Sequence, residues 1–161
     1  MSVTSVEKDF ENLTLTVIAE FDAPLERVWR LWADPRLLER WWGPPTHPAT
    51  VEAHDLTPDG HVRYVMTGPD GEASRGWWRI TAVEPPRLLE FVDAWAGEDG
   101  TPNPDAPTTR VHVLLTEHPG GTRMHIRSVF ESLEHMEWLD RIGAIETFRR
   151  TVGQMDALLA G

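Results

Sequence analysis

The sequence contains no cysteine in its 161 residues. A disulfide framework, a thiolate zinc site and a cysteine nucleophile are therefore excluded. No apolar run is long enough to span a bilayer, and the N-terminal segment does not resemble a signal peptide. We therefore expect a cytoplasmic protein.

Positive charge is also scarce, since 15 lysines and arginines oppose 26 aspartates and glutamates and leave a net charge of −11. Proteins recognise nucleic acids and anionic membranes through basic patches. We therefore expect neither nucleic acid nor a membrane surface as a main partner.

The motifs of common catalytic sites are missing as well. The sequence has no HExxH metal motif and no GxSxG nucleophile motif. His112 and His125 fall on strands that we expect to pair, but a catalytic zinc usually has three protein ligands. The glycine-containing segments 68–71 and 119–121 read as turns and do not open a helix, as a phosphate loop would. We expect no metal, no cofactor and no nucleophile triad.

Tryptophan, by contrast, is abundant, and four of the eight fall in one segment, FDAPLERVWRLWADPRLLERWWGPP at 21–45. Asp22 is placed to cap a helix that has Pro24 in its first turn. Asp34 and Pro35 end that helix and begin a second one, which a Gly-Pro-Pro run stops. We expect two short helices in a V, around which a curved sheet wraps.

The rest of the chain alternates between strand patterns and turn residues. Apolar side chains recur at every second position, and segments containing Pro, Asp and Gly separate the runs. Residues 1–12 are polar, and we expect them to be flexible. The predicted strands cover residues 13–21, 49–56, 61–67, 74–84, 87–95, 109–117 and 122–130.

A long amphipathic helix is predicted from about Leu133 to Ala160, with Ser132 as its cap. A curved antiparallel sheet needs a cover on its concave face, and this helix is long enough to provide it. We therefore predict an α+β fold, with about six to seven strands wrapped around the C-terminal helix and two short helices after the first strand. No repeat or linker divides residues 1–161, which indicates a single domain.

The tryptophan-rich segment resembles the opening of START-like (SRPBCC) domains, in the branch named after the homologue of the heat-shock-protein-90 ATPase activator. Two positions depart from the pattern: Asp59 stands where many members have glycine, and Glu20 stands where the preceding strand often ends in arginine. The resemblance implies the helix-grip fold, with a cavity between sheet and terminal helix. The likeness continues through DLTPDG (55–60), GPDG (68–71), EPPRLL (84–89), TRM (122–124) and GQMDALL (153–159).

Apolar side chains that are in phase on several strands and on the helix would share this interior. They would form either a solid core or the wall of an apolar ligand cavity, with the loop 96–108 as a lid. The predicted ligand-binding residues are Trp32, Trp42, Tyr64, Met66, Trp78, Phe91, Trp95, Met124, Ile126, Phe130, Leu139, Ile142 and Glu146.

Three polar side chains are candidates for this cavity: Tyr64, Asp93 and Glu146. Asp93 interrupts an apolar strand face, so we expect a bulge to turn it outward; the alternative is a buried carboxylate that needs a partner. Glu146 either pairs with Arg149 on the surface or faces the cavity as an acid. Gly143, inside the predicted helix, indicates the close approach of another group, and related family members often carry a glutamate after a glycine there.

Three functions follow from these patterns. We prefer the binding of a small hydrophobic molecule in the cavity. The second is a cyclase-, dehydratase- or hydrolase-like enzyme that uses Glu146, Asp93 or Tyr64. The third, implied by the family name, is a co-chaperone-like interaction module, although the eukaryotic activators carry an additional N-terminal domain. The sequence leaves open the identity of the ligand and whether the protein forms a homodimer.

Overall fold

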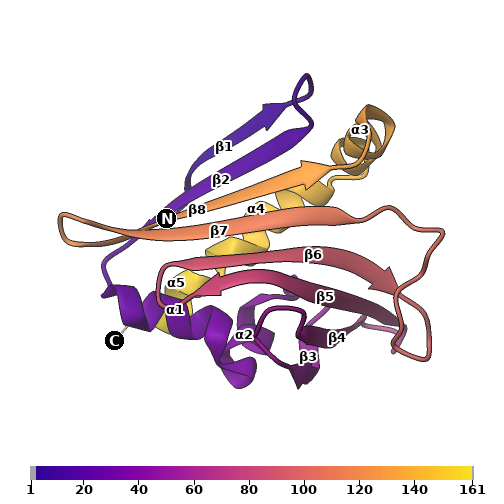
Figure 1. The fold of residues 1–161 in the computed structure, drawn as a ribbon, viewed down its shortest axis with the longest axis horizontal. Helices are drawn as coiled ribbons and strands as arrows, with labels where there is room; N and C mark the ends of the chain where they lie inside the picture. The colour runs from indigo at the N-terminus through magenta and orange to yellow at the C-terminus, as the bar shows by residue number, and fades with distance from the viewer. Residues whose placement is uncertain (1–2, 161) are drawn as a thin grey trace.

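One antiparallel sheet runs through residues 3–160, which the computed structural model describes (Figure 1). The strand order is β1-β2-β8-β7-β6-β5-β4-β3, so only β2 and β8 are neighbours that lie far apart in sequence. The α+β class and the curved sheet confirm the predicted fold, with eight strands in this part of the chain rather than six or seven. The strands are β1 (Val3–Asp9), β2 (Thr14–Phe21), β3 (Ala49–His54), β4 (His61–Thr67), β5 (Ala73–Glu84), β6 (Leu88–Ala96), β7 (Thr109–His118) and β8 (Gly121–Phe130).

The additional strand is β1, and the expected flexibility of residues 1–12 is wrong for Val3–Asp9. β1 pairs antiparallel with β2. Val3 is buried and Val6 packs against the core, whereas Glu7 is exposed. The outer face of an antiparallel sheet is in contact with water, so many residues of β1 are polar although its backbone is paired with β2. Residues 1–2 lie outside the described part of the chain.

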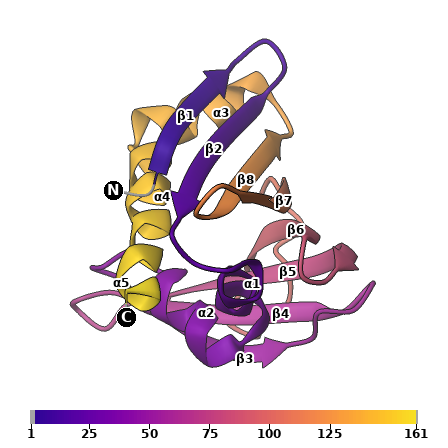
Figure 2. The ribbon, with the colours of Figure 1, turned by 90° about the vertical axis from the view of Figure 1, so that its left-hand side faces the viewer.

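Two short helices, α1 (Leu25–Ala33) and α2 (Pro35–Trp41), follow β2, as the sequence predicts. α1 begins after Pro24 without a side-chain cap, so the predicted cap at Asp22 is wrong. Asp34 caps α2, because its carboxylate accepts the backbone N–H two residues later at 2.9 Å. Figure 2 shows both helices on the side of the molecule where β3 and β4 lie.

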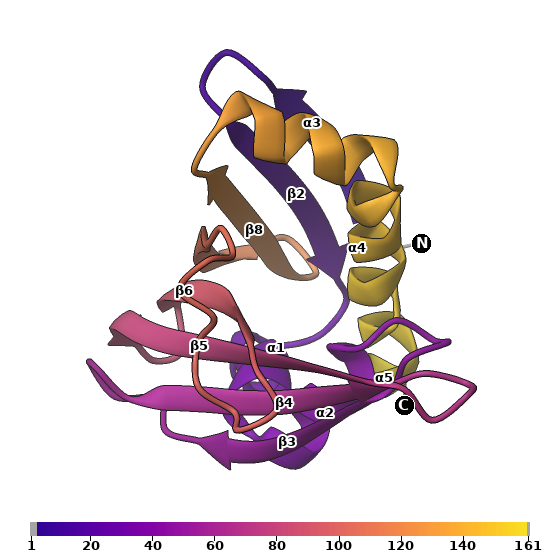
Figure 3. The same ribbon diagram turned by 90° about the vertical axis from the view of Figure 1, so that its right-hand side faces the viewer.

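The C-terminal segment forms three helices, α3 (Leu133–Arg141), α4 (Ala144–Gly153) and α5 (Met155–Leu159), rather than one continuous helix. The predicted cap is confirmed, since Ser132 Oγ accepts the backbone N–H of His135 at 3.1 Å. The interruption arises because Gly143 has φ +80°, a left-handed conformation that ends the first helix and redirects the chain. In Figure 3, α4 runs at an angle to α3 along the open side of the curved sheet.

An aromatic cluster forms the centre of the core between the two short helices and the sheet. Trp78 and Phe91 stack with ring centroids 3.9 Å apart, and Trp42 meets Trp78 edge to face at 4.8 Å. Trp32 and Trp41 extend the cluster with a further edge contact at 4.7 Å. Such pairs contribute about 0.5–1.5 kcal/mol each beyond their area of burial. Trp42 is the member of this cluster that also reaches the cavity described below.

One side-chain amide ties the C-terminal helices to this cluster. Gln154 Nε2 donates to the carbonyl oxygens of Gly43 at 2.7 Å and Trp41 at 2.9 Å. The last carbonyls of a helix lack partners within that helix, so Gln154 supplies donors to the end of α2. The junction between α4 and α5 is thereby held against α2, which fixes how the terminal helices cover the sheet.

Candidate ligand-binding cavity

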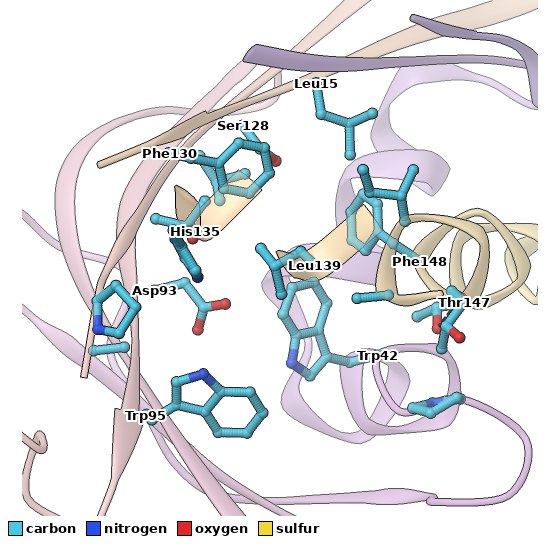
Figure 4. Close-up of a pocket in the computed structure, with 18 of the residues that line it drawn as sticks. Leu15, Trp42, Asp93, Trp95, Ser128, Phe130, His135, Leu139, Thr147 and Phe148 are labelled. Carbon is cyan, nitrogen blue, oxygen red and sulfur yellow. Dashed lines mark hydrogen bonds between the residues drawn. The ribbon is translucent and has the colours of Figure 1, made fainter. Parts of the chain in front are cut away.

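A cavity of about 340 Å³ lies between the sheet and the terminal helices. Its walls come from β2, from β4 to β8, and from α3 and α4 (Figure 4). This volume falls at the lower end of the range of small-molecule sites, roughly 300–1,000 Å³. The lining residues are Leu15, Trp42, Pro44, Tyr64, Met66, Ser74, Asp93, Ala94, Trp95, Pro107, Thr109, Val111, Ser128, Phe130, His135, Leu139, Ala144, Ile145, Thr147, Phe148 and Thr151.

Part of the predicted site lies on the cavity wall. Six of the residues predicted to bind a ligand line the cavity, and so does Asp93, which the sequence singled out as a polar candidate. They reach the cavity from the end of α2 and from β4, β6, β8 and α3. The six are Trp42, Tyr64, Met66, Trp95, Phe130 and Leu139.

Five other predicted residues are fully buried and do not line the cavity. Four of them lie on strands, in phase with lining residues, and the fifth lies on α1 and packs against them; all five belong to the solid core. The alternation of side chains along a strand indicates which face of the sheet a residue occupies. It does not indicate where along the strand the solid core ends and the cavity begins. The sequence posed a solid core and a cavity as alternatives, and the interior contains both. The five residues are Trp32, Trp78, Phe91, Met124 and Ile126.

The expected cavity positions of Ile142 and Glu146 are wrong. Ile142 caps the end of α3 and is 56% exposed. Glu146 lies exposed in the first turn of α4 and is 3.7 Å from Arg149 in a surface ion pair. The turn at Gly143 changes the direction of the helix, so the apolar stripe of α3 does not continue in phase into α4. Nothing lies within 4 Å of a Cβ added at Gly143, so its left-handed backbone explains the glycine better than close approach.

Tyr64 and Asp93 form a polar pair in the cavity wall. Tyr64 Oη donates to Asp93 Oδ1 at 2.9 Å. Gly76 lies directly opposite Tyr64 in the β4–β5 ladder, and the tyrosine ring occupies the space that a side chain at Gly76 would need. The expected outward rotation of Asp93 is wrong, because its carboxylate points into the cavity (Figure 4). The arrangement corresponds to the alternative, an inward-facing carboxylate with a partner, and the Asp93 side chain is half-buried.

The protein environment shifts the protonation of both groups in this pair. Burial raises the pKa of Asp93 to about 7, and the hydrogen bond from Tyr64 opposes part of that rise. Burial also raises the pKa of Tyr64 well above 10, and the negative charge of Asp93 adds to the effect. Tyr64 therefore stays a hydrogen-bond donor, while Asp93 changes its charge near neutral pH.

His135 is a polar group of the cavity that sequence reasoning missed. It lies in the first turn of α3, is 9% exposed, and makes an edge contact to Phe130 at 5.7 Å. Its Nδ1 is buried without a hydrogen-bond partner, and burial lowers the pKa of its imidazole. The helix cap at Ser132 and the spacing of four residues to Leu139 could have placed His135 on the cavity face.

Several small or polar lining residues were also missed. Ser128 falls between Ile126 and Phe130 at strand spacing, so its phase could have identified it. Thr147, Phe148 and Thr151 lie on α4, whose orientation depends on the turn at Gly143 and was not accessible from the sequence pattern.

No metal site accompanies these groups within residues 3–160, where no three His, Asp or Glu side chains are arranged to hold an ion. His112 and His125 are on paired strands, but His112 lies opposite Arg127 and His125 lies opposite Leu114. The two imidazoles are therefore offset rather than facing. None of the helices in this part of the chain is long and apolar enough to cross a membrane.

Residues 22–160 match the family described as Activator of Hsp90 ATPase homolog 1-like protein. The chain belongs to this family. The resemblance found in the motifs is thereby confirmed, and this Hsp90-activator-like family has a fold of the ligand-binding type. No curated protein sequence matches the chain.

Solved structures of bacterial proteins share the fold along almost the whole chain. Protein Ms6760 from Mycobacterium smegmatis is 48% identical, with a TM-score of 0.89 over 99% of this chain and 98% of that one. A protein from Arthrobacter aurescens is 49% identical, with a TM-score of 0.93 over 98% of this chain and 92% of that one. A more distant protein from Staphylococcus epidermidis, 22% identical with a TM-score of 0.85 over 97% and 93% of the two chains, shares the fold. A co-chaperone role and a homodimer remain predictions for this Hsp90-activator-like chain.

Proposed function

We propose that this Hsp90-activator-like protein binds a small hydrophobic molecule in the cavity between its sheet and its terminal helices. The supporting observation is the cavity itself: about 340 Å³, walled mainly by aromatic and aliphatic side chains, with polar groups that include Tyr64, Asp93 and His135. Apolar sites with a small number of placed polar groups are typical of small-molecule binding. Burial of apolar ligand surface would supply roughly 25 cal/mol per Å².

The test compares two substitutions of the same kind at neighbouring positions. Leu139→Trp places a large side chain in the cavity, whereas Ile142→Trp places it on the exposed end of α3. Calorimetric titration with a panel of small apolar molecules should find a saturable ligand for the unaltered protein and for Ile142→Trp. Leu139→Trp should reduce the affinity for that ligand at least tenfold. Undiminished binding by Leu139→Trp would overturn the cavity as the binding site.

A second candidate function is acid–base catalysis in the same cavity. The observation that favours it is the Tyr64–Asp93 pair, because burial raises the pKa of Asp93 to about 7 and a catalytic acid is most effective near the working pH. A protonated Asp93 would donate to a leaving hydroxyl, and its carboxylate would accept a proton from the substrate. For a ligand that the protein converts, Asp93→Asn should abolish turnover and retain binding. Turnover unchanged in Asp93→Asn would exclude this role.

A further inference from the structure

The carboxylate of Asp93 has no positive partner in the described part of the chain. Its hydrogen bond comes from the neutral hydroxyl of Tyr64. None of the ion pairs among residues 3–160 includes Asp93. A charge removed from water is normally paired, because desolvation without a partner is costly. When it is ionised, Asp93 is therefore a negative group in the cavity wall whose counter-charge no described residue supplies, and a cationic ligand would stabilise that ionised form.

His135 does not provide that charge. Its imidazole is buried, and burial lowers its pKa, so the ring is neutral at pH 7. The buried Nδ1 has no hydrogen-bond partner, and an unprotonated ring nitrogen is an acceptor. Figure 4 shows the carboxylate of Asp93 directed into the cavity, with His135 on one side and Trp95 on the other. This side of the cavity thus offers the Asp93 carboxylate as an acceptor and, in the tautomer that carries its proton on Nε2, also His135 Nδ1.

The aromatic walls favour the same sign of charge. Trp42 and Trp95 both line the cavity, and Trp95 is 50% exposed although it is a large apolar side chain. The faces of indole rings attract cations. An anion would instead be repelled by Asp93, and the hydroxyl proton of Tyr64 is already donated. Among the described residues no lysine or arginine lines the cavity, and the unpartnered indole N–H of Trp42 is a neutral donor, so the wall favours a cation over an anion.

Resting on the proposed binding function, we propose that the ligand is a hydrophobic amine whose ammonium group pairs with Asp93. An ammonium carries three N–H donors, which the Asp93 carboxylate and His135 Nδ1 can accept while the aromatic rings flank the charge. The apolar body of the amine then occupies the remainder of the cavity, between Trp42, Leu139 and Phe148 (Figure 4).

The test uses three probes that share one apolar body and differ in the end group. These are 4-phenylbutylamine, 4-phenylbutan-1-ol and 4-phenylbutanoic acid, titrated by calorimetry at neutral pH. The amine should bind at least tenfold more tightly than the alcohol, and the acid should bind most weakly. Asp93→Asn, which keeps the shape of the side chain and an oxygen for Tyr64, should reduce amine binding to the level of the alcohol and leave alcohol binding unchanged.

Glu146→Gln is the matched control, because it removes one negative charge at an exposed position outside the cavity. It should keep the preference for the amine, which separates pairing with Asp93 from attraction to the overall charge of −11. Equal binding of amine and alcohol, tighter binding of the acid, or an amine preference that persists in Asp93→Asn would overturn the inference and leave the proposed function standing. Binding of none of the three probes, together with no saturable ligand in the broader panel of apolar molecules, would overturn both.

Discussion

Gly76 lies directly across the β4–β5 ladder from Tyr64, and the tyrosine ring fills the space beside the bare glycine backbone. A Cβ at Gly76 would overlap the ring and displace it from Asp93. We expect Gly76→Ala to lower the free energy of unfolding by about 1–3 kcal/mol, as overpacking of a core does. Urea unfolding would measure the loss.

Gly153→Ala is the control for that substitution. Gly153 ends α4, and nothing lies within 4 Å of a Cβ added there. An alanine stabilises a helix by about 0.5–1 kcal/mol relative to a glycine. This variant should therefore unfold at the same or a higher urea concentration than the unaltered protein. Equal destabilisation by both variants would contradict the role assigned to the Gly76–Tyr64 contact.

The pKa of Asp93 predicts how stability changes with pH. Its pKa is raised from 3.8 to about 7 in the folded protein, so the folded state holds a proton that the unfolded chain releases. This difference in proton binding contributes its full stabilisation below about pH 4. The stabilisation decreases as the pH rises and is lost as the pH passes through 7. Relative to the unaltered protein, Asp93→Asn should therefore gain stability between about pH 4 and pH 8, by at most about 4 kcal/mol.

Urea unfolding of both proteins across this pH range would measure the difference. Asp99→Asn provides a contrast of the opposite sign, because hydrogen bonds from Thr101 lower the pKa of Asp99. A stability difference between Asp93→Asn and the unaltered protein that stays constant with pH would contradict the raised pKa.

The fold was largely predictable from the sequence because alternating apolar residues, as in β2 and β8, leave little choice of register and face. Two features were not predicted, the strand β1 and the break in the C-terminal helix at Gly143, and each has a physical reason. β1 is an edge strand whose exposed positions are polar, so it resembles a flexible tail. Gly143 looked like an interruption within one helix, because the sequence does not distinguish a glycine that allows close packing from one that adopts a positive φ.

The cavity was predictable only in part. Alternation identified the inward face of each strand, which correctly included Tyr64 and Phe130. It could not separate Phe91, in the solid core, from Asp93, two positions further along the same strand and in the cavity wall. That boundary depends on where the aromatic cluster ends, and the cluster is assembled from segments that are distant in sequence.

The loop 96–108 remains a predicted lid, and its connection at Thr108 provides a test. The Glu131 carboxylate accepts the backbone N–H of Thr108 at 3.1 Å and its hydroxyl at 3.2 Å. The adjacent Pro107 lines the cavity. Glu131→Ala should free this end of the loop and raise both the association and the dissociation rate of a bound ligand several-fold, with a smaller change in affinity. Stopped-flow tryptophan fluorescence would measure the rates.

Glu117→Ala is the control for the lid experiment. Glu117 is exposed and pairs with Arg87 at 3.1 Å, and neither residue lines the cavity. Ligand exchange should be unchanged in this variant. Exchange rates that are also unchanged in Glu131→Ala would count against the lid.

The positive φ of Gly143 leads to a separate prediction about the stability of variants at this position. A residue with a Cβ at φ +80° is strained, at a cost of roughly 1–2 kcal/mol. Gly143→Ala should therefore lower the free energy of unfolding by about that amount, whereas Gly143→Asn should lower it less, because asparagine tolerates the left-handed region better. Denaturant unfolding would rank the three proteins. An alanine variant as stable as the original would show that the turn is not what requires glycine.

The strand order also determines when the sheet can close as the chain folds. From β3 to β8 each strand pairs with its neighbour in sequence, so these six strands can form from local hairpins. β2 must find β8 across a loop of about a hundred residues, as the Glu20–Arg123 bond at a separation of 103 shows. Contacts this distant form slowly, because the entropy of closing the loop is lost first. We therefore expect the β1–β2 hairpin to dock late, and during synthesis β2 cannot pair with β8 until β8 has been made.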